Sequence, residues 1–344
     1  MSTNRTAGRT IRAVAPRPQA EALRAAYLEL LKLSLCDLAG VGTESVYRTF
    51  HREPRIYSQE LPTDKMHYRV SGRDWPLHAL TMAGLKRLDD LQLCVESVVE
   101  DDIEGDLIEA GTWRGGASIL MRATLDSLGA DERTVWLADS FEGFPEADPD
   151  AFPDDADGDD LSGLSFLAAP LEQVRGHFGR FGFERGVRFV PGFFSETMPS
   201  LRGGRWSVVR LDGDTYESTW LTLESLYPGL STGGYLIVDD YQFVAECRRA
   251  VDQFRREHEI AEPLEYVDWS CVRWRRESEP VPAARPRRPR QAERRKASSR
   301  SVAPQPARIP SWHELELERQ LDGLRERLRA AESEIEQLRQ STKA

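Results

Sequence analysis

The stretch that decides the fold is residues 106–118, DLIEAGTWRGGAS, in which a short apolar run leads directly into a glycine-rich loop. Gly111 stands where the chain would turn after a strand, and Gly115 with Gly116 stands where a helix would begin. Glycine allows a sharp turn and a close approach of the backbone to a ligand, and the first turn of a helix offers free N–H donors. The stretch therefore predicts a strand, a ligand-binding turn and a helix in succession.

Further short apolar runs follow this stretch and alternate with segments of helical periodicity. Continuous apolar strands separated by helices indicate a parallel sheet that is covered on both faces. The last two runs have no helix between them, so we expect them to form an antiparallel hairpin at one edge. Seven strands with this ending favour the α/β class and a mostly parallel, Rossmann-like methyltransferase sheet over a two-half dinucleotide fold. The expected strands are 106–110, 134–138, 187–190, 206–212, 234–240, 264–268 and 270–275.

The chain before the first strand, and an acidic segment after the second, complete this picture. Residues 23–38 and 77–99 have the apolar periodicity of helices. Residues 40–76 are aromatic and charged, and we interpret them as a long, functional loop. The aspartate-rich segment 148–160 lacks the regular spacing of an EF-hand, so we interpret it as a mobile lid over the site rather than as a calcium loop.

Composition divides the chain into four parts. Residues 21–276 hold nearly all the large apolar clusters and form the expected catalytic domain, with a helical and lid region on its N-terminal side. A disordered tail (1–20) precedes this domain, and a basic, Pro-rich linker (277–311) follows it. Residues 312–340 repeat apolar side chains at alternating spacings of 4 and 3, which favours a coiled-coil helix over a lone amphipathic helix docked on the domain. Its apolar positions are Leu317, Leu321, Leu324, Leu328, Ala331, Ile335 and Leu338.

The charge and the cysteines narrow the class of protein. The 344 residues carry a net charge of −11, which argues against a general nucleic-acid or membrane-surface binder. The chain has no apolar run of about 18 residues, and its N-terminus lacks the apolar core of a signal peptide. The four cysteines form no CxxC pair, so zinc spacing is absent and we expect reduced, packed thiols in the cytoplasm.

The glycine loop and the ends of the second and third strands indicate a nucleoside site. The pattern GxxxGG matches neither GxGxxG nor a P-loop, so a nucleoside with a charged tail is favoured over a pyrophosphate. Asp139, followed by Ser140, closes the second strand, where an acidic side chain accepts hydrogen bonds from ribose; the alternative is an aspartate that only caps a loop. Gly192 and Phe193 follow the third strand, and Phe193 either stacks on a base or packs in the core.

Carboxyl groups follow the fourth and fifth strands. Asp212 and Asp214 follow the fourth strand, and Asp239 and Asp240 close the fifth. Because adjacent parallel strands end close together, we expect Asp212, Asp239 and Asp240 to converge. Converging carboxylates repel one another unless a cation or protons intervene, and Mg²⁺ prefers oxygen ligands; the alternative is a group of solvated aspartates without a metal. Mg²⁺ would lower the pKa of a substrate hydroxyl, with Asp212 as the favoured proton acceptor. Rival bases are His67, His78, His177 and His258.

The same segments also carry a family resemblance. They are TMAGLKRLDDLQ (81–92), DLIEAGTWRGGASILMRA (106–123), WLADSFEGFP (136–145), GFFSETMP (192–199) and VVRLDGDTYESTWLTLESLYPGLSTGGYLIVDDY (208–241). In this order they resemble the macrocin O-methyltransferase (TylF-like) family. The resemblance covers roughly residues 22–275, and the presence of several motifs together makes it specific.

The resemblance implies that the chain uses S-adenosylmethionine and Mg²⁺ to methylate a sugar hydroxyl on an antibiotic scaffold or another glycan. By that resemblance Asp212, Asp239 and Asp240 match the metal ligands, and Asp212 also matches the base. It further implies that the glycine loop holds the methionine end of the cofactor, that Asp139 contacts the ribose and that residues 81–82 cover the cofactor. Together with the residues above, the cofactor-binding candidates are Thr81, Met82, Glu109, Gly111, Gly115, Ser118, Asp139, Ser140, Gly192 and Phe193.

The linker and the heptad segment, residues 277–344, are not part of the family core and suggest tethering or assembly. The expected partners are a small-molecule glycoside or glycan and further copies of the chain in a homo-oligomer, with no nucleic acid and no membrane span. Three other functions stay open. They are an enzyme of the same fold that acts on a non-sugar diol or catechol, a non-catalytic scaffold with a coiled-coil tail, and a nicotinamide oxidoreductase, which the missing GxGxxG disfavours.

Overall fold

The centre of the molecule is a seven-stranded sheet. The computed structural model describes residues 17–40, 43–48, 56–146, 151–155, 161–162 and 164–277. The strands of the central sheet are β4 (Asp106–Ala110), β5 (Val135–Asp139), β6 (Val187–Pro191), β7 (Trp206–Leu211), β8 (Leu230–Val238), β9 (Glu265–Tyr266) and β10 (Val272–Arg275). Their order is β6-β5-β4-β7-β8-β10-β9. The first five of these pair in parallel, whereas β10 runs antiparallel to both β8 and β9. The predicted Rossmann-like sheet and its edge hairpin are therefore confirmed.

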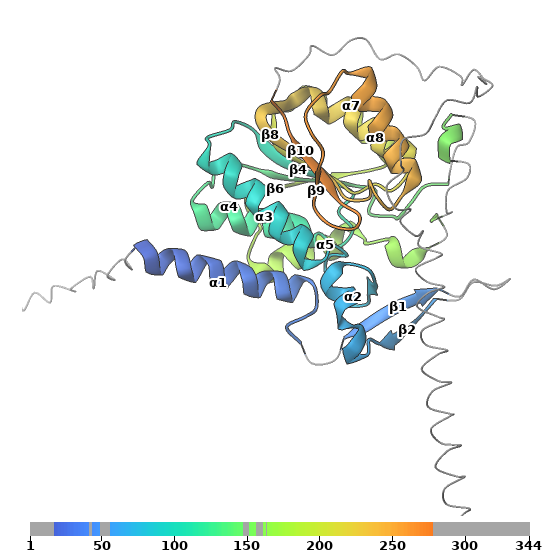
Figure 1. Ribbon diagram of the computed structural model, residues 1–344. Coiled ribbons are helices and arrows are strands. Elements are labelled where there is room, and N and C mark those ends of the chain that lie inside the picture. Colours follow the sequence, from blue (N-terminus) through green and yellow to red (C-terminus); the bar gives the residue numbers. More distant parts are fainter. Residues whose placement is uncertain are drawn as a thin grey trace, which may run out of the picture.

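Helices cover both faces of this sheet (Figure 1). One face carries α1 (Arg17–Leu35), α3 (Leu85–Glu100), α4 (Gly116–Leu128) and α5 (Leu171–Phe181). The other face carries α7 (Tyr216–Leu226) and α8 (Ala245–Glu257). Two shorter helices are α2 (Met66–Ser71) and α6 (Phe194–Thr197), and single turns of 3-10 helix are η1 (Thr63–Lys65), η2 (Pro153–Asp155), η3 (Ser165–Leu167), η4 (Met198–Leu201) and η5 (Tyr227–Gly229).

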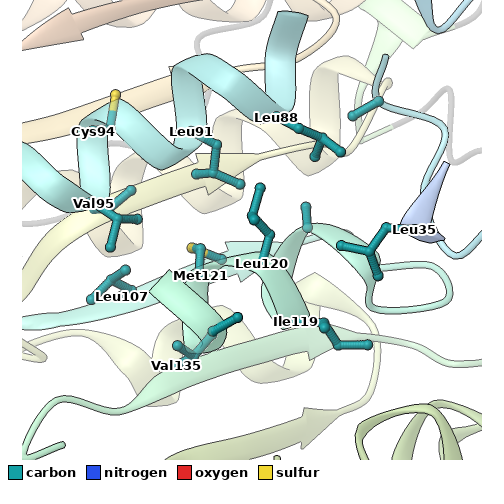
Figure 2. Packing of buried hydrophobic residues seen from close by; sticks show 14 of the residues in the cluster. Leu35, Leu88, Leu91, Cys94, Val95, Leu107, Ile119, Leu120, Met121 and Val135 are labelled. Atoms are coloured by element: carbon teal, nitrogen blue, oxygen red, sulfur yellow. The ribbon is translucent and has the colours of Figure 1, made fainter. Parts of the chain in front are cut away.

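The two apolar cores follow from the alternation of side chains along each strand. Leu107 of β4 packs with α3 and α4, whereas the next residue, Ile108, packs with α7 and α8. Both side chains are fully buried. Figure 2 shows the first core, where Leu91 of α3 and Leu120 of α4 meet above β4. The central strands β4 and β7 are buried on both faces because each face of the sheet supports a layer of helices.

The order of the strands places a ligand site at one edge of the sheet. From β4 the chain adds β5 and β6 on one side and then crosses to add β7 and β8 on the other. In open α/β sheets, ligands bind outside the carboxyl ends of the strands at such a switch point. The glycine loop after β4 and the aspartates after β7 lie at this point.

The prediction of a long loop over residues 40–76 is largely wrong. This region contains β1 (Glu44–Arg48), β2 (Ile56–Glu60) and β3 (Trp75–Pro76), which form a separate antiparallel sheet with the order β2-β1-β3. Tyr47 and Tyr57 lie directly opposite each other in the β1–β2 register, and their rings stack at 5.4 Å. Such cross-strand aromatic pairs stabilise a sheet. The charged residues around this pair interrupt the alternation that would have indicated strands in the sequence.

The helix expected over residues 77–99 begins only at Leu85, with Gly84 in an extended conformation before it. The preceding residues serve the glycine loop instead of a helix. The carbonyl of Leu80 accepts a hydrogen bond from the N–H of Gly116 at 2.9 Å, and Arg114 donates to the carbonyls of Leu77 and Ala79. The first eight residues of the predicted helix therefore form a loop that binds the start of α4.

The ends of the described chain differ from the predicted boundaries in one respect. α1 begins at Arg17, inside the segment 1–20 that composition assigns to a tail. Pro18 stands in its first turn, where proline is tolerated because the N–H groups there have no acceptor within the helix. Apart from residue 277, the predicted linker (277–311) and the whole coiled-coil helix (312–340) lie outside the described residues.

Two further predictions concern the cysteines and the membrane. All four cysteines are buried and unpaired, as expected for packed thiols. Burial raises the pKa of Cys36 and of Cys94 to about 12, so neither thiol is a reactive thiolate near neutral pH. In the part of the chain that the structure describes, every helix is too short or too polar to cross a bilayer.

Candidate active site

A cavity lies at the carboxyl edge of the sheet, between the glycine loop, the loops after β5 and β6, and the start of α7. Of the predicted site residues, Met82, Gly111, Asp139, Ser140, Phe193 and Asp212 line this cavity. Four others lie behind its wall: Thr81 is buried and accepts the N–H of Ala83, Gly115 precedes α4, and Glu109 and Ser118 bond to each other. Gly192 precedes the lining residue Phe193 and donates its N–H to the carbonyl of Asp139 at 3.0 Å.

The glycine loop is held tightly against the loop after β7. Gly111 has φ +86°, and a Cβ atom built on it would lie 1.8 Å from the carbonyl oxygen of Asp212. The N–H of Asp212 in turn donates to the carbonyl of Ala110 at 2.8 Å. Only glycine fits between these two strand ends, so the loop that meets the cavity is fixed relative to Asp212.

Asp139 organises two loops at once. Its Oδ2 accepts the N–H groups of Thr112 at 2.7 Å and Trp113 at 3.0 Å, and its Oδ1 accepts the N–H of Phe141 at 2.8 Å. The hydroxyl of Thr112 makes a further, weak contact with Oδ2 at 3.4 Å. Asp139 therefore caps both loops, and because it also lines the cavity, its contact with a ribose stays a prediction.

Two phenylalanines follow β6, and the alternatives for them are stacking on a base and packing in the core. Phe193 lines the cavity at the start of α6. Its neighbour Phe194 lines the same cavity and also packs against the core beneath α7 and α8. Both rings therefore border the cavity, Phe194 also belongs to the core, and the stacking of Phe193 on a base stays a prediction.

Three carboxyl groups converge beside this cavity. One oxygen from each of Asp212, Asp239 and Asp240 lies within 4.8 Å of the other two. Asp212 follows β7 and Asp239 with Asp240 follows β8, so the juxtaposition results from the parallel pairing of these strands. Asp239 and Asp240 are buried, whereas Asp212 is partly exposed to the cavity.

Two buried arginines, which the sequence analysis missed, accompany these carboxyl groups. Arg210 of β7 forms ion pairs with Asp212, Asp239 and Glu109. Arg87 of α3 forms ion pairs with Asp239 and with Asp268. An arginine inside the apolar strand VVRLD was the only sequence signal for this arrangement.

The electrostatics of the cluster differ from one carboxyl to the next. Burial raises the pKa of Asp212, and burial together with neighbouring acids raises the pKa of Asp240 further and that of Asp214 to about 8. Burial alone would raise the pKa of Asp239, but the guanidinium groups of Arg210 and Arg87 hold it below its ordinary value. The two arginines therefore leave part of the negative charge uncompensated.

The residues present suit a divalent cation such as Mg²⁺. The Oδ2 atom of Asp240 is buried and has no hydrogen-bond partner among the described residues. A buried carboxylate oxygen without a partner is costly, and a hard cation is the ligand that would satisfy it. All three converging side chains offer oxygen atoms, which is the donor type that Mg²⁺ prefers.

The four rival histidines are not placed to act on a ligand in this cavity. None of them is among the described residues that line it. His177 lies in α5, where its Nδ1 contacts the carbonyl of Arg114 at 2.9 Å. His258 follows α8 and stacks on Phe254. His67 and His78 lie outside the cavity, in α2 and in the loop before α3.

The described part of the acidic segment 148–160 is anchored to α7. Asp155 accepts the N–H groups of Tyr216 at 2.6 Å and Glu217 at 3.0 Å, which have no acceptor within the helix. Asp154 pairs with Arg249 of α8 at 3.3 Å. Asp155 therefore caps the helix whose first turn lines the cavity, and the remainder of the predicted lid stays a prediction.

We expect Asp155→Ala to lower the free energy of unfolding by about 1–2 kcal/mol, because it removes the acceptor for two N–H groups of α7 that the N-cap residue Thr215 does not bind. Asp154→Ala is the matched control, since its side chain pairs only at the surface and such pairs contribute about 0–1 kcal/mol. Urea denaturation of both variants measures the difference. Equal losses in the two variants would contradict the capping role.

Comparison with known proteins agrees with the geometry of this site. The family model described as macrocin O-methyltransferase (TylF) matches residues 25–276. The 8-demethyl-8-(2,3-dimethoxy-alpha-L-rhamnosyl)-tetracenomycin-C 4'-O-methyltransferase of Streptomyces olivaceus is 46% identical over 256 residues, which are 74% of this chain and 94% of that protein. The demethyldecarbamoylnovobiocin O-methyltransferase of Streptomyces niveus is 44% identical over 247 residues, covering 72% of this chain and 92% of that protein. Among solved structures, the O-methyltransferase NovP is similar with a TM-score of 0.63 at 39% identity, covering 74% of this chain and 100% of that one.

Proposed function

This chain belongs to the macrocin O-methyltransferase (TylF) family, and from that premise we propose that it moves a methyl group from S-adenosylmethionine to a sugar hydroxyl of a glycosylated natural product or glycan, with Mg²⁺ as the metal. The relatives named for glycosylated antibiotics support the class of acceptor. The observation that carries the proposal is the convergence of Asp212, Asp239 and Asp240 beside the cavity formed by the glycine loop. The four buried, unpaired cysteines support a cytoplasmic location for this activity.

The cofactor side of the site is proposed to use the residues around the glycine loop. Asp139 already accepts three backbone N–H groups, and a ribose hydroxyl would replace the weak contact from the hydroxyl of Thr112. Phe193 and Met82 offer apolar surfaces to the rest of the nucleoside. Gly111 lets the backbone approach the ligand, and Ser140 stands next to Asp139 in the same wall.

The acceptor side is proposed to use the aspartates. When bound, S-adenosylmethionine supplies the methyl group and Mg²⁺ lowers the pKa of the acceptor hydroxyl. Asp212, Asp239 and Asp240 would hold the ion, and Asp212, which faces the cavity, would take the proton of the hydroxyl. The chain itself positions the two reactants, because direct methyl transfer needs alignment more than covalent catalysis.

A second candidate for the proton acceptor is Asp214. Its side chain lines the cavity, and a carboxylate close to the acceptor hydroxyl can take the proton of that hydroxyl. Asp214 therefore competes with Asp212 for this role, and the Asp212 prediction in the Discussion separates the two.

We expect the purified protein to add one methyl group to glycosides with free sugar hydroxyls when S-adenosylmethionine and Mg²⁺ are supplied. Mass spectrometry of a panel that contains glycosides, their aglycones and simple catechols measures the acceptor class. Exhaustive chelation should stop the reaction, and Mg²⁺ should restore it. Methylation of catechols alone would reject the sugar acceptor, and activity that survives chelation would reject the metal. The homo-oligomeric state stays a prediction.

A further inference from the structure

Arg210 connects three strands of the central sheet through one side chain. It is 2% exposed, and its Nη1 donates to Oε1 of Glu109 at 2.6 Å and to Oδ2 of Asp212 at 2.8 Å. Its Nη2 donates to Oδ1 of Asp239. Glu109 lies on β4, Asp212 follows β7 and Asp239 follows β8, so the guanidinium spans the switch point of the sheet.

The planar guanidinium group is suited to this task. It offers five N–H donors in a fixed fork, and it stays charged at every physiological pH. A lysine ammonium carries the same charge but is a compact point charge, so it cannot hold three carboxylates from three strands in one plane. The geometry around Arg210 therefore depends on the shape of its side chain as well as on its charge.

Glu109 extends this connection to the far side of the glycine loop. It is 1% exposed, and its Oε2 accepts a hydrogen bond from the hydroxyl of Ser118 on α4. α4 begins directly after the glycine loop. A continuous chain of hydrogen bonds thus runs from Ser118 through Glu109 and Arg210 to Asp212 and Asp239.

We propose that Arg210 is a positioning residue that links the cofactor loop to the metal-binding carboxyl groups, so that the binding of Mg²⁺ and of the cofactor both depend on this guanidinium. The inference rests on the proposed function, because it concerns the metal and cofactor assigned there. It adds to that function a physical connection between two sites that lie on different strands. Partners of this kind, which orient a metal ligand without touching the metal, typically account for about 10–100-fold in metal affinity.

The test compares Arg210→Lys with wild type, because lysine keeps the charge and removes the fork. We expect the Kd of Mg²⁺ to rise about tenfold or more, and the Kd of S-adenosylhomocysteine to rise as well. Isothermal titration calorimetry measures both constants in the absence of turnover. Thermal denaturation, recorded in parallel, shows whether the variant is folded at the temperature of the titration.

Arg122→Lys is the matched control for burial of an arginine. Arg122 is 1% exposed on α4, and its Nη1 donates to the carbonyl of Arg133 at 2.6 Å, away from the cavity. We expect this variant to lose thermal stability while its affinities for Mg²⁺ and S-adenosylhomocysteine stay unchanged. A purely structural role for Arg210 would produce the same pattern in Arg210→Lys.

The outcomes separate this inference from the proposed function. Affinities of folded Arg210→Lys within about twofold of wild type would overturn the positioning role and leave the proposed function intact. If Arg210→Lys does not fold, Ser118→Ala decides, because it removes the anchor of Glu109 with little loss of packing. A severalfold rise in the Kd of Mg²⁺ supports the connection in that variant, and an unchanged Kd overturns it. Wild-type protein that binds no Mg²⁺ would overturn both the function and the inference.

Discussion

Asp212→Asn is expected to abolish methyl transfer while the protein still binds S-adenosylhomocysteine. An amide cannot accept the proton of the acceptor hydroxyl, and it lacks the charge that holds a hard cation. Loss of a general base alone lowers kcat by about 10²–10⁴-fold, so loss of both roles should leave no measurable turnover. The cofactor side should be spared, because Asp212 contacts the glycine loop directly through its backbone carbonyl and the amide oxygen of asparagine can still accept the hydrogen bond from Arg210.

The measurement combines a methylation assay with titrations of Mg²⁺ and S-adenosylhomocysteine. Asp214→Asn is the comparison variant, since Asp214 lines the same cavity but lies outside the group of converging oxygens. If Asp212→Asn methylates the acceptor as fast as wild type, Asp212 is neither the base nor a required ligand of the metal. If Asp214→Asn loses methylation but still binds Mg²⁺, while Asp212→Asn keeps methylation, the base role belongs to Asp214.

Gly111→Ala is expected to prevent the domain from folding stably. The new Cβ would lie 1.8 Å from the carbonyl oxygen of Asp212, and φ at this position is +86°. Neither strand end can withdraw, because the N–H of Asp212 also donates to the carbonyl of Ala110. The collision involves backbone on both sides, so we expect a loss above about 4 kcal/mol, a large share of the roughly 5–15 kcal/mol that stabilises a typical domain.

Gly182→Ala is the matched control for this prediction. Gly182 ends α5 with φ +77°, and a Cβ atom there would meet nothing within 4 Å. Only the left-handed backbone conformation is then penalised, at about 1–2 kcal/mol. Urea denaturation of both variants, with calorimetry of S-adenosylhomocysteine binding, measures the contrast. Equal stabilities in the two variants would show that the strand ends separate easily.

Much of the fold could be predicted because its signals are local. A buried parallel strand is apolar along its length, so runs such as 106–110 and 206–212 were visible without any knowledge of their neighbours. β4 matches its predicted range, and the ends of β5, β6 and β7 differ from the prediction by at most one residue. β8 begins four residues before its predicted start and ends two residues before its predicted end, and β9 and β10 are shorter than predicted. The region 40–76 failed because its strands are short, polar and partly exposed, which leaves little periodicity to detect.

Part of the site was predictable for the same reason. Acidic residues directly after two neighbouring strands must lie at one edge of a parallel sheet, which is why Asp212, Asp239 and Asp240 were expected together. The lining residues lie at the same edge for the same reason: Gly111 follows β4, Asp139 ends β5 and Phe193 follows β6. Glu109 and Ser118 belong to the same segment, but the structure places them behind the wall rather than in it.

The sequence by itself determined the strands of the central sheet, the helices that cover them and the edge at which the functional side chains meet, because these depend on short-range periodicity and on the order of the elements. Only the tertiary structure decided how the charges at that edge are balanced. Arg87 and Asp239 are 152 positions apart, and nothing in either local sequence indicates that they pair. Arg210 likewise becomes a link between three carboxyl groups only when β4, β7 and β8 lie side by side, because an ion pair depends on distance in space and not on distance along the chain.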